Sequence, residues 1–139
     1  MLCSVIVPTY KEKLNLRPLI TRVFAALDKT KLKNQVELIV VDDNSNDGSK
    51  EEVEALAKVN ETKKNKKKKK KKNLSTLSQE GFKCRIEVRT KERGLSSAVI
   101  HGFNLATGRE ALLCMDADLQ HPPEKVSAVV CLFGWLVLF

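Results

Sequence analysis

Residues 111–124 read ALLCMDADLQHPPE, an apolar run that ends in two aspartates spaced by one residue, followed by a double proline. The apolar run predicts a buried strand at residues 111–115. Comparable apolar runs occur three more times, at residues 2–7, 36–41 and 86–88. Amphipathic helical patterns separate these runs. The alternation predicts an α/β fold in which a parallel sheet is flanked by helices.

The helical patterns carry their own start signals. Apolar residues recur at helical spacing from Leu16 to Leu27, with Asn15 as the expected N-cap and Pro18 in the expected first turn. Ser49 and Glu52 have the spacing of a capping box at the start of a second helix.

Two residues are expected to end elements. Pro8 should end the first strand, and Gly108 should follow a third helix at residues 95–106 as its C′ residue. In such a fold the carboxyl ends of the strands share one rim of the sheet, where ligands bind.

The chain has 139 residues and is 42% apolar, which predicts one globular domain, placed at residues 1–127. Residues 61–80 consist mainly of Lys, Asn, Ser and Thr and are expected to form a disordered lysine-rich insert. Residues 128–139 form an apolar tail that is shorter than the roughly 20 residues a membrane-spanning helix needs.

The net charge of +8 comes from one tract, because nine lysines lie within residues 63–72 and the rest of the chain is close to neutral. We therefore expect no nucleic-acid-binding surface on the domain. The tract could bind anionic lipid or RNA, or be low-complexity sequence without a partner. The four cysteines show neither zinc-ligand spacing nor a disulfide pattern, which favours a reducing compartment.

Asp116 and Asp118 follow the strand at residues 111–115, and the two-residue period of an extended chain directs both carboxylates to one side. Gln120 adds a third oxygen ligand. Mg²⁺ and Mn²⁺ bind such oxygen ligands, commonly together with substrate phosphates. The alternative is that both aspartates are loop acids at the start of a following helix.

Asp42 and Asp43 end the second strand in the same way, and Tyr10 and Glu12 follow the first. The acids after residues 36–41 and those after residues 111–115 lie at two strand ends on one rim. They repel unless a cation or a ligand's donors compensate, which favours a binding site over ordinary turns. Tyr10 could stack on a base or simply be partly buried. The motifs of dehydrogenases, P-loop NTPases and α/β-hydrolases are absent from the sequence, and His101 and His121 are left without a role.

Four segments, in order along the chain, resemble the N-terminal half of dolichyl-phosphate mannosyltransferases, which are family 2 glycosyltransferases with a Rossmann-like GT-A nucleotide-sugar-binding fold. The segments are SVIVPTYKEKLN (4–15), ELIVVDDNSNDGS (37–49), VRTKERGLSSAVIHGF (88–103) and CMDADLQHPPE (114–124). Apart from the lysine-rich insert, the resemblance covers residues 2–127.

The resemblance implies transfer of mannose from GDP-mannose to dolichyl phosphate at the cytosolic face of the endoplasmic reticulum membrane, with inversion at the anomeric carbon. It implies that Asp116 and Asp118 are catalytic and, with Gln120, bind a divalent cation, Mg²⁺ or Mn²⁺. The positions it implies for nucleotide-sugar binding are Pro8, Tyr10, Glu12, Asp42, Asp43, Arg93, Gly94, Leu95 and Ser96.

The sequence departs from this family at the lysine-rich insert and after the PPE segment, where the family continues with the residues that hold the acceptor phosphate. We therefore expect a C-terminally truncated form whose own activity is in doubt. Two alternatives remain open: a polyprenyl-phosphate glycosyltransferase that uses a UDP-sugar, and an inactive nucleotide-sugar-binding remnant or interaction protein.

Overall fold

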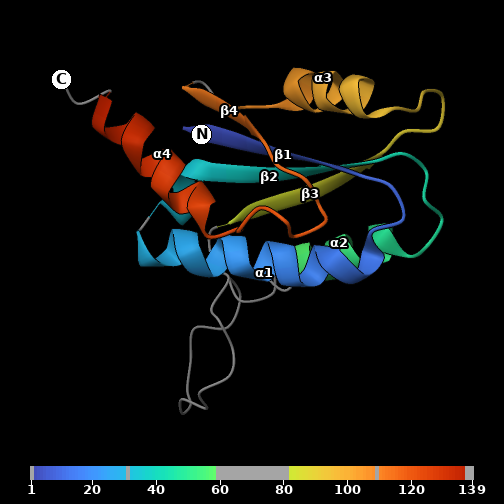
Figure 1. Cartoon of the computed structure of the whole chain (residues 1–139), viewed down its shortest axis with the longest axis horizontal. Coiled ribbons are helices and arrows are strands. Elements are labelled where there is room, and N and C mark those ends of the chain that lie inside the picture. Colours follow the sequence, from blue (N-terminus) through green and yellow to red (C-terminus); the bar gives the residue numbers. More distant parts are fainter. Residues whose placement is uncertain (1, 31, 59–81, 109, 137–139) are drawn as a thin grey trace, which may run out of the picture.

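A computed structural model describes residues 2–30, 32–58, 82–108 and 110–136, so the predicted disordered insert at residues 61–80 lies outside the described residues (Figure 1). Four strands form one parallel sheet in the order β3-β2-β1-β4. The elements in chain order are β1 (Cys3–Thr9), α1 (Lys13–Lys29), a 3₁₀ turn (Lys33–Gln35), β2 (Val36–Asp42), α2 (Ser49–Lys58), β3 (Lys83–Val88), α3 (Leu95–Leu105), β4 (Ala111–Cys114) and α4 (Lys125–Leu136).

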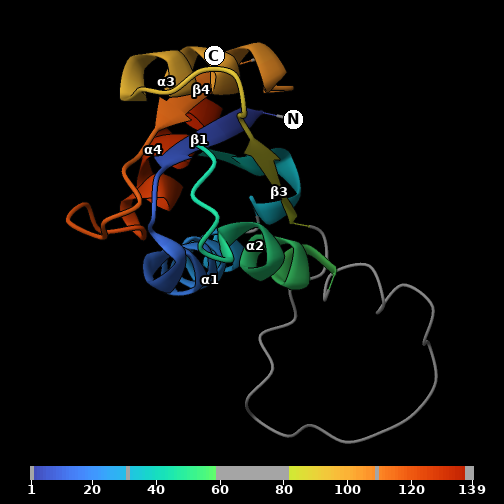
Figure 2. The same ribbon diagram turned by 90° about the vertical axis from the view of Figure 1, so that its right-hand side faces the viewer.

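Helices cover both faces of the sheet, which confirms the predicted fold class. Seen along the sheet, α1 and α2 lie on one side and α3 on the other (Figure 2). Val126 and Val130 of α4 join the apolar core on the α1 side. On the opposite side, Ala98 of α3 packs against Ile6 and Ile39. The middle strands β1 and β2 are buried along their whole length because both of their faces are covered.

The prediction that Pro8 ends the first strand is wrong. The strand continues to Thr9, and Pro8 pairs with Val41 of β2. On the other side of β1 the pairing with β4 stops at Ile6. Proline is tolerated at this point because β1 has a neighbouring strand on one side only, so its missing N–H leaves no gap in a ladder.

The predicted helix starts are wrong in detail. Helix α1 begins at Lys13, so Asn15 is not its N-cap and Pro18 lies in the second turn. The Asn15 side chain instead donates a hydrogen bond of 2.6 Å to the Glu12 carboxylate. Asparagine can satisfy its amide in this way from inside the first turn, so its identity does not fix the boundary.

The predicted capping box at the start of α2 does not form. The Ser49 hydroxyl donates to the Asp47 carboxylate at 2.6 Å, and the Ser49 N–H donates to the same oxygen at 2.9 Å. Glu52 forms an ion pair with Arg17 of α1 instead of turning back to Ser49. Asp47 therefore does the capping because a carboxylate accepts both hydrogen bonds at once.

Gly108 is not the C′ residue of α3, because the helix ends at Leu105 with Ala106 as its C-cap. Gly108 lies against β1, where a Cβ atom would come within 2.5 Å of the Ser4 backbone nitrogen. The glycine thus permits a close approach of two backbone segments. In the part of the chain that the structure describes, no helix combines the length and apolar character that crossing a membrane requires.

Candidate functional site

The carboxyl ends of β1 and β2 border a cavity of about 340 Å³, on the rim where ligands were expected to bind. The β1 end and the residue after β2 contribute one wall, and the segment that leads into α3 contributes the other. The lining residues are Pro8, Thr9, Tyr10, Asp43, Arg93, Gly94, Leu95 and Ala98. Six of the nine residues expected to bind a nucleotide sugar therefore meet in one place.

Tyr10 stands at the mouth of this cavity with about half of its side-chain surface exposed. Two cations lie near its ring: Lys11 Nζ is 5.3 Å and Arg93 Cζ is 5.8 Å from the ring centroid. A half-exposed aromatic ring with cations beside it offers an apolar surface next to positive charge. That combination suits a base joined to phosphates.

Asp43 sits in the cavity wall directly after β2, and it is 7% exposed. One oxygen, Oδ2, accepts the Gly94 N–H at 2.7 Å. The other, Oδ1, accepts the Nε–H of Arg89 at 2.8 Å and a second, shorter hydrogen bond from the same guanidinium. Burying a carboxylate is costly unless charged, hydrogen-bonding partners of this kind compensate for the lost water.

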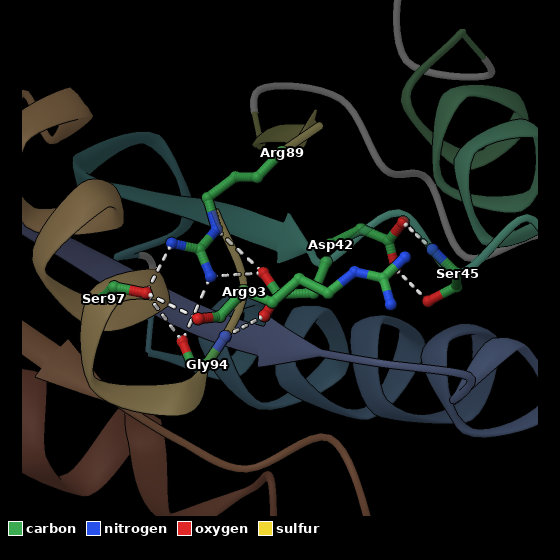
Figure 3. A network of polar contacts seen from close by, with 7 residues as sticks. Asp42, Ser45, Arg89, Arg93, Gly94 and Ser97 are labelled. Carbon is green, nitrogen blue, oxygen red and sulfur yellow. Dashed lines mark hydrogen bonds and ion pairs between the residues drawn. The ribbon is translucent and has the colours of Figure 1, made fainter. Parts of the chain in front are cut away.

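Arg89 is a residue that the sequence analysis missed. Its guanidinium is buried and also reaches Ser97 Oγ and the Gly94 carbonyl, as Figure 3 shows. The available signal was a charged residue placed directly after the apolar end of β3, where a buried position is expected to be apolar. Sequence alone does not show that Asp43 lies opposite.

Asp42 is turned away from the cavity and towards Ser45 (Figure 3). Its Oδ2 accepts the Ser45 N–H at 2.9 Å, and its Oδ1 accepts the Ser45 hydroxyl. Asp42 borders a separate cavity of about 360 Å³ formed by the turn after β2. Asp42 and Asp43 thus both have partners within the protein, Ser45 and Arg89, so the acids at this strand end do not by themselves require a ligand.

Glu12 and Ser96 do not line the cavity that Tyr10 and Asp43 border. Glu12 is the N-cap residue of α1 and accepts the Asn15 amide. Ser96 is exposed in the first turn of α3. Both remain predictions, near the cavity but outside its wall.

Asp116 and Asp118 lie just beyond β4 and are both exposed, whereas Met115 and Ala117 are buried. Residues 117 and 118 lie in a turn and not in an extended chain, so the placement of both carboxylates on one side remains a prediction. Asp118 Oδ1 accepts the Gln120 N–H at 3.0 Å, and Asp116 Oδ2 lies 3.7 Å from His121 Nδ1.

This donor set fits a hard divalent cation that also takes ligands from a substrate. Exposed carboxylates pay little desolvation cost and keep free lone pairs for a metal. Within the described ranges, no group of three or more His, Cys, Asp or Glu side chains is positioned to hold a metal ion by itself. Any cation bound here must therefore complete its coordination with Gln120, water or ligand phosphates.

Residues 4–134 match the family described as Glycosyl transferase family 2. The chain is 53% identical over 123 residues to a dolichol-phosphate mannosyltransferase of Saccharomyces cerevisiae, covering 88% of this chain and 38% of the relative. It is 49% identical over 131 residues to a protein of the same name from Mycosarcoma maydis, covering 92% of this chain and 37% of the relative. The chain thus spans less than two-fifths of the length of these relatives.

Among solved structures, a mannosyltransferase from Pyrobaculum calidifontis in complex with GDP-Man and Mn²⁺ superposes with a TM-score of 0.68. The match covers 93% of this chain and 31% of that chain, at 24% sequence identity. At this identity the similarity establishes the fold. It confirms the expected Rossmann-like GT-A architecture.

Proposed function

We propose that this chain, which belongs to glycosyl transferase family 2, forms the donor-binding part of a dolichyl-phosphate mannosyltransferase. The reaction is transfer of mannose from GDP-mannose to dolichyl phosphate. One observation carries the proposal: the cavity at the strand ends joins Tyr10, Asp43 and Gly94, which come from three of the segments that resemble this enzyme family.

The cavity would hold the nucleoside of the donor. Its volume of about 340 Å³ lies at the lower end of the range for small-molecule sites. Tyr10 offers its exposed face to the base, and the Asp43 carboxylate can accept a further hydrogen bond from a base N–H. Guanine presents N–H donors on one edge, and one of them could donate to the lone pair of Asp43 Oδ2 that the protein leaves free.

The diphosphate would extend from this cavity along the rim towards Asp116 and Asp118. These carboxylates, with Gln120, would hold a Mg²⁺ or Mn²⁺ ion, and a bound divalent cation neutralises the charge that develops on a departing nucleoside diphosphate. Arg93 and Lys11, beside Tyr10, add positive charge where the phosphates would leave the cavity.

The acceptor needs no general base from the protein. A phosphate monoester has a second pKa near 6, so it is largely a dianion at neutral pH and already a nucleophile. An attack from the side opposite the departing GDP inverts the anomeric carbon. Because the acceptor is a lipid, we place the reaction at a membrane. The resemblance to dolichyl-phosphate mannosyltransferases implies the cytosolic face of the endoplasmic reticulum membrane.

A second candidate is a polyprenyl-phosphate glycosyltransferase with another donor, such as a UDP-sugar. The observation in its favour is 33% identity over 129 residues to an undecaprenyl-phosphate 4-deoxy-4-formamido-L-arabinose transferase of Aeromonas hydrophila. The Asp116 and Asp118 pair would serve a UDP-sugar equally well.

Transfer of radiolabelled mannose to dolichyl phosphate tests the proposal. Membranes from cells expressing the native gene product are incubated with labelled GDP-mannose, dolichyl phosphate and Mn²⁺, and chloroform-extractable label is counted. We expect a labelled lipid with the wild type and at least about a hundredfold less with Asp118→Asn. Transfer from a UDP-sugar instead of GDP-mannose would favour the second candidate, and equal label in both variants would contradict the role of Asp118.

A further inference from the structure

We infer that Arg89 is a positioning residue of the donor cavity, which holds the Asp43 carboxylate and the Gly94 backbone in the orientation that receives the nucleoside. The inference rests on the proposed function. Arg89 does not line the cavity itself. Its effect on a ligand would therefore be transmitted through the two lining residues that it contacts.

The guanidinium joins three acceptors that come from different segments of the chain. It donates to Asp43 after β2, to the Gly94 carbonyl at 3.1 Å, and to Ser97 Oγ in the first turn of α3 at 2.9 Å. Its side chain is only 4% exposed. Solvent therefore cannot replace these donors when the side chain is shortened.

Both backbone polar groups of Gly94 form hydrogen bonds with side chains. Its N–H donates to Asp43, and its carbonyl accepts from Arg89 and from the Ser97 hydroxyl at 3.0 Å. Gly94 has a φ of +120°, a conformation that residues other than glycine rarely adopt. The hydrogen bonds to Asp43 and Arg89 fix where Arg93 and Leu95, on either side of Gly94, enter the cavity wall.

The Asp43 carboxylate is fixed by the same contacts. Oδ1 accepts two hydrogen bonds from Arg89 and Oδ2 accepts one from Gly94, so only the remaining lone pair of Oδ2 is available to a ligand. Its direction is set by Arg89 and Gly94. A lysine in place of Arg89 would keep the positive charge, but its ammonium cannot reproduce the planar fork that reaches three acceptors.

Binding of GDP in the presence of Mn²⁺, measured by calorimetry, tests this role in Arg89→Lys. The matched control is Arg85→Lys, the same substitution in β3 at a half-exposed arginine whose partners, Glu37 and Leu105, do not line the cavity. We expect Arg89→Lys to weaken GDP binding by about tenfold or more and Arg85→Lys to leave it within about twofold of the wild type.

Amide hydrogen exchange gives a readout that does not depend on the nucleotide. In Arg89→Lys the Gly94 amide should exchange at least about tenfold faster, while the amides of β1 and β2 keep wild-type protection. If Arg89→Lys fails to fold, Arg89→Gln is compared in its place. Wild-type exchange at Gly94 together with wild-type GDP affinity in the variant would overturn the inference. Failure of the wild type to bind GDP would overturn the proposed function instead.

Discussion

The Arg22 guanidinium binds the Glu124 carboxylate at two points, with Nε 2.6 Å from Oε1 and NH2 3.0 Å from Oε2. Arg22 lies in the middle of α1, and Glu124 immediately precedes α4. The segment that carries Asp116 and Asp118 is thus anchored at one end by the pairing of β4 with β1 and at the other end by this ion pair. The hydrogen bond from Arg22 lowers the pKa of Glu124, so the pair persists at neutral pH.

Glu124→Gln should weaken Mn²⁺-dependent nucleotide binding by several fold because the segment after β4 loses its second anchor. Both side chains are nearly half exposed, so the melting temperature should stay close to that of the wild type. Calorimetry and thermal unfolding measure the two effects. Exchanging the charges, with Arg22→Glu and Glu124→Arg together, should restore part of the affinity; a Glu124→Gln protein that binds like the wild type would contradict the anchoring role.

Gly102 is the contact point of α3 with the sheet. A Cβ atom at this position would lie 2.3 Å from Ile6 Cγ2 and 3.2 Å from Val41 Cγ2, both in the core. Gly102→Ala should therefore destabilise the fold by about 1–3 kcal/mol through overpacking, despite the higher helix propensity of alanine. Asn104→Ala, on the exposed side of the same helix, is the matched control and should be neutral or slightly stabilising in urea denaturation.

Glu37 should make stability depend on pH. Burial raises its pKa, but hydrogen bonds from Ser4 and Thr107 and the charge of Arg85 outweigh burial and hold the pKa below its ordinary value of 4.5. A carboxyl group with a lowered pKa in the folded state contributes stability that is fully present above its unfolded pKa and is lost as pH falls through the folded value.

Urea denaturation of the wild type and of Glu37→Gln between pH 7 and about pH 3 measures this contribution. The difference in unfolding free energy between the two proteins should be largest at neutral pH and shrink below about pH 4.5. A difference that stays constant over the whole range would contradict the assignment.

Thr9 carries a buried hydroxyl that has no hydrogen-bond partner among the described residues. Thr9→Val replaces this hydroxyl with a methyl group of similar shape, so it should leave stability unchanged or raise it by up to about 1 kcal/mol. Thr9 also lines the cavity that Tyr10 and Asp43 border. We expect the Thr9 hydroxyl to form a hydrogen bond with the bound nucleotide, so Thr9→Val should bind GDP several fold more weakly than the wild type. Unchanged GDP affinity would contradict such a contact.

The fold could be predicted because its signals are local. Apolar runs such as Val36 to Val41 and the stripe from Leu16 to Leu27 determine the type and order of the elements, and parallel pairing then places the strand ends together. The errors concern boundaries. Pro8 and Gly108 each have a frequent local role, and a contact with another segment took precedence there. Ser49 is instead bound by Asp47, two residues away in the same turn.

The position of the candidate site could be predicted from the sequence, but the hydrogen-bond partners of its side chains could not. Asp42 and Asp43 are neighbours with the same chemistry, yet one closes a turn onto Ser45 and the other faces the cavity. Arg89 is 46 residues from Asp43 in sequence, so only the packing of β3 against β2 reveals their contact. Partners so far apart leave no spacing pattern to detect.

The central claim is that this chain holds a divalent-cation-dependent site for a guanosine nucleotide. Calorimetric titration with GDP-mannose and, in parallel, with UDP-glucose, each with and without Mn²⁺, tests it most directly. We predict that GDP-mannose binds, that Mn²⁺ strengthens this binding by at least about tenfold, and that Asp118→Asn abolishes the strengthening. Preference for UDP-glucose, or GDP-mannose binding that is the same with and without Mn²⁺, would contradict the account.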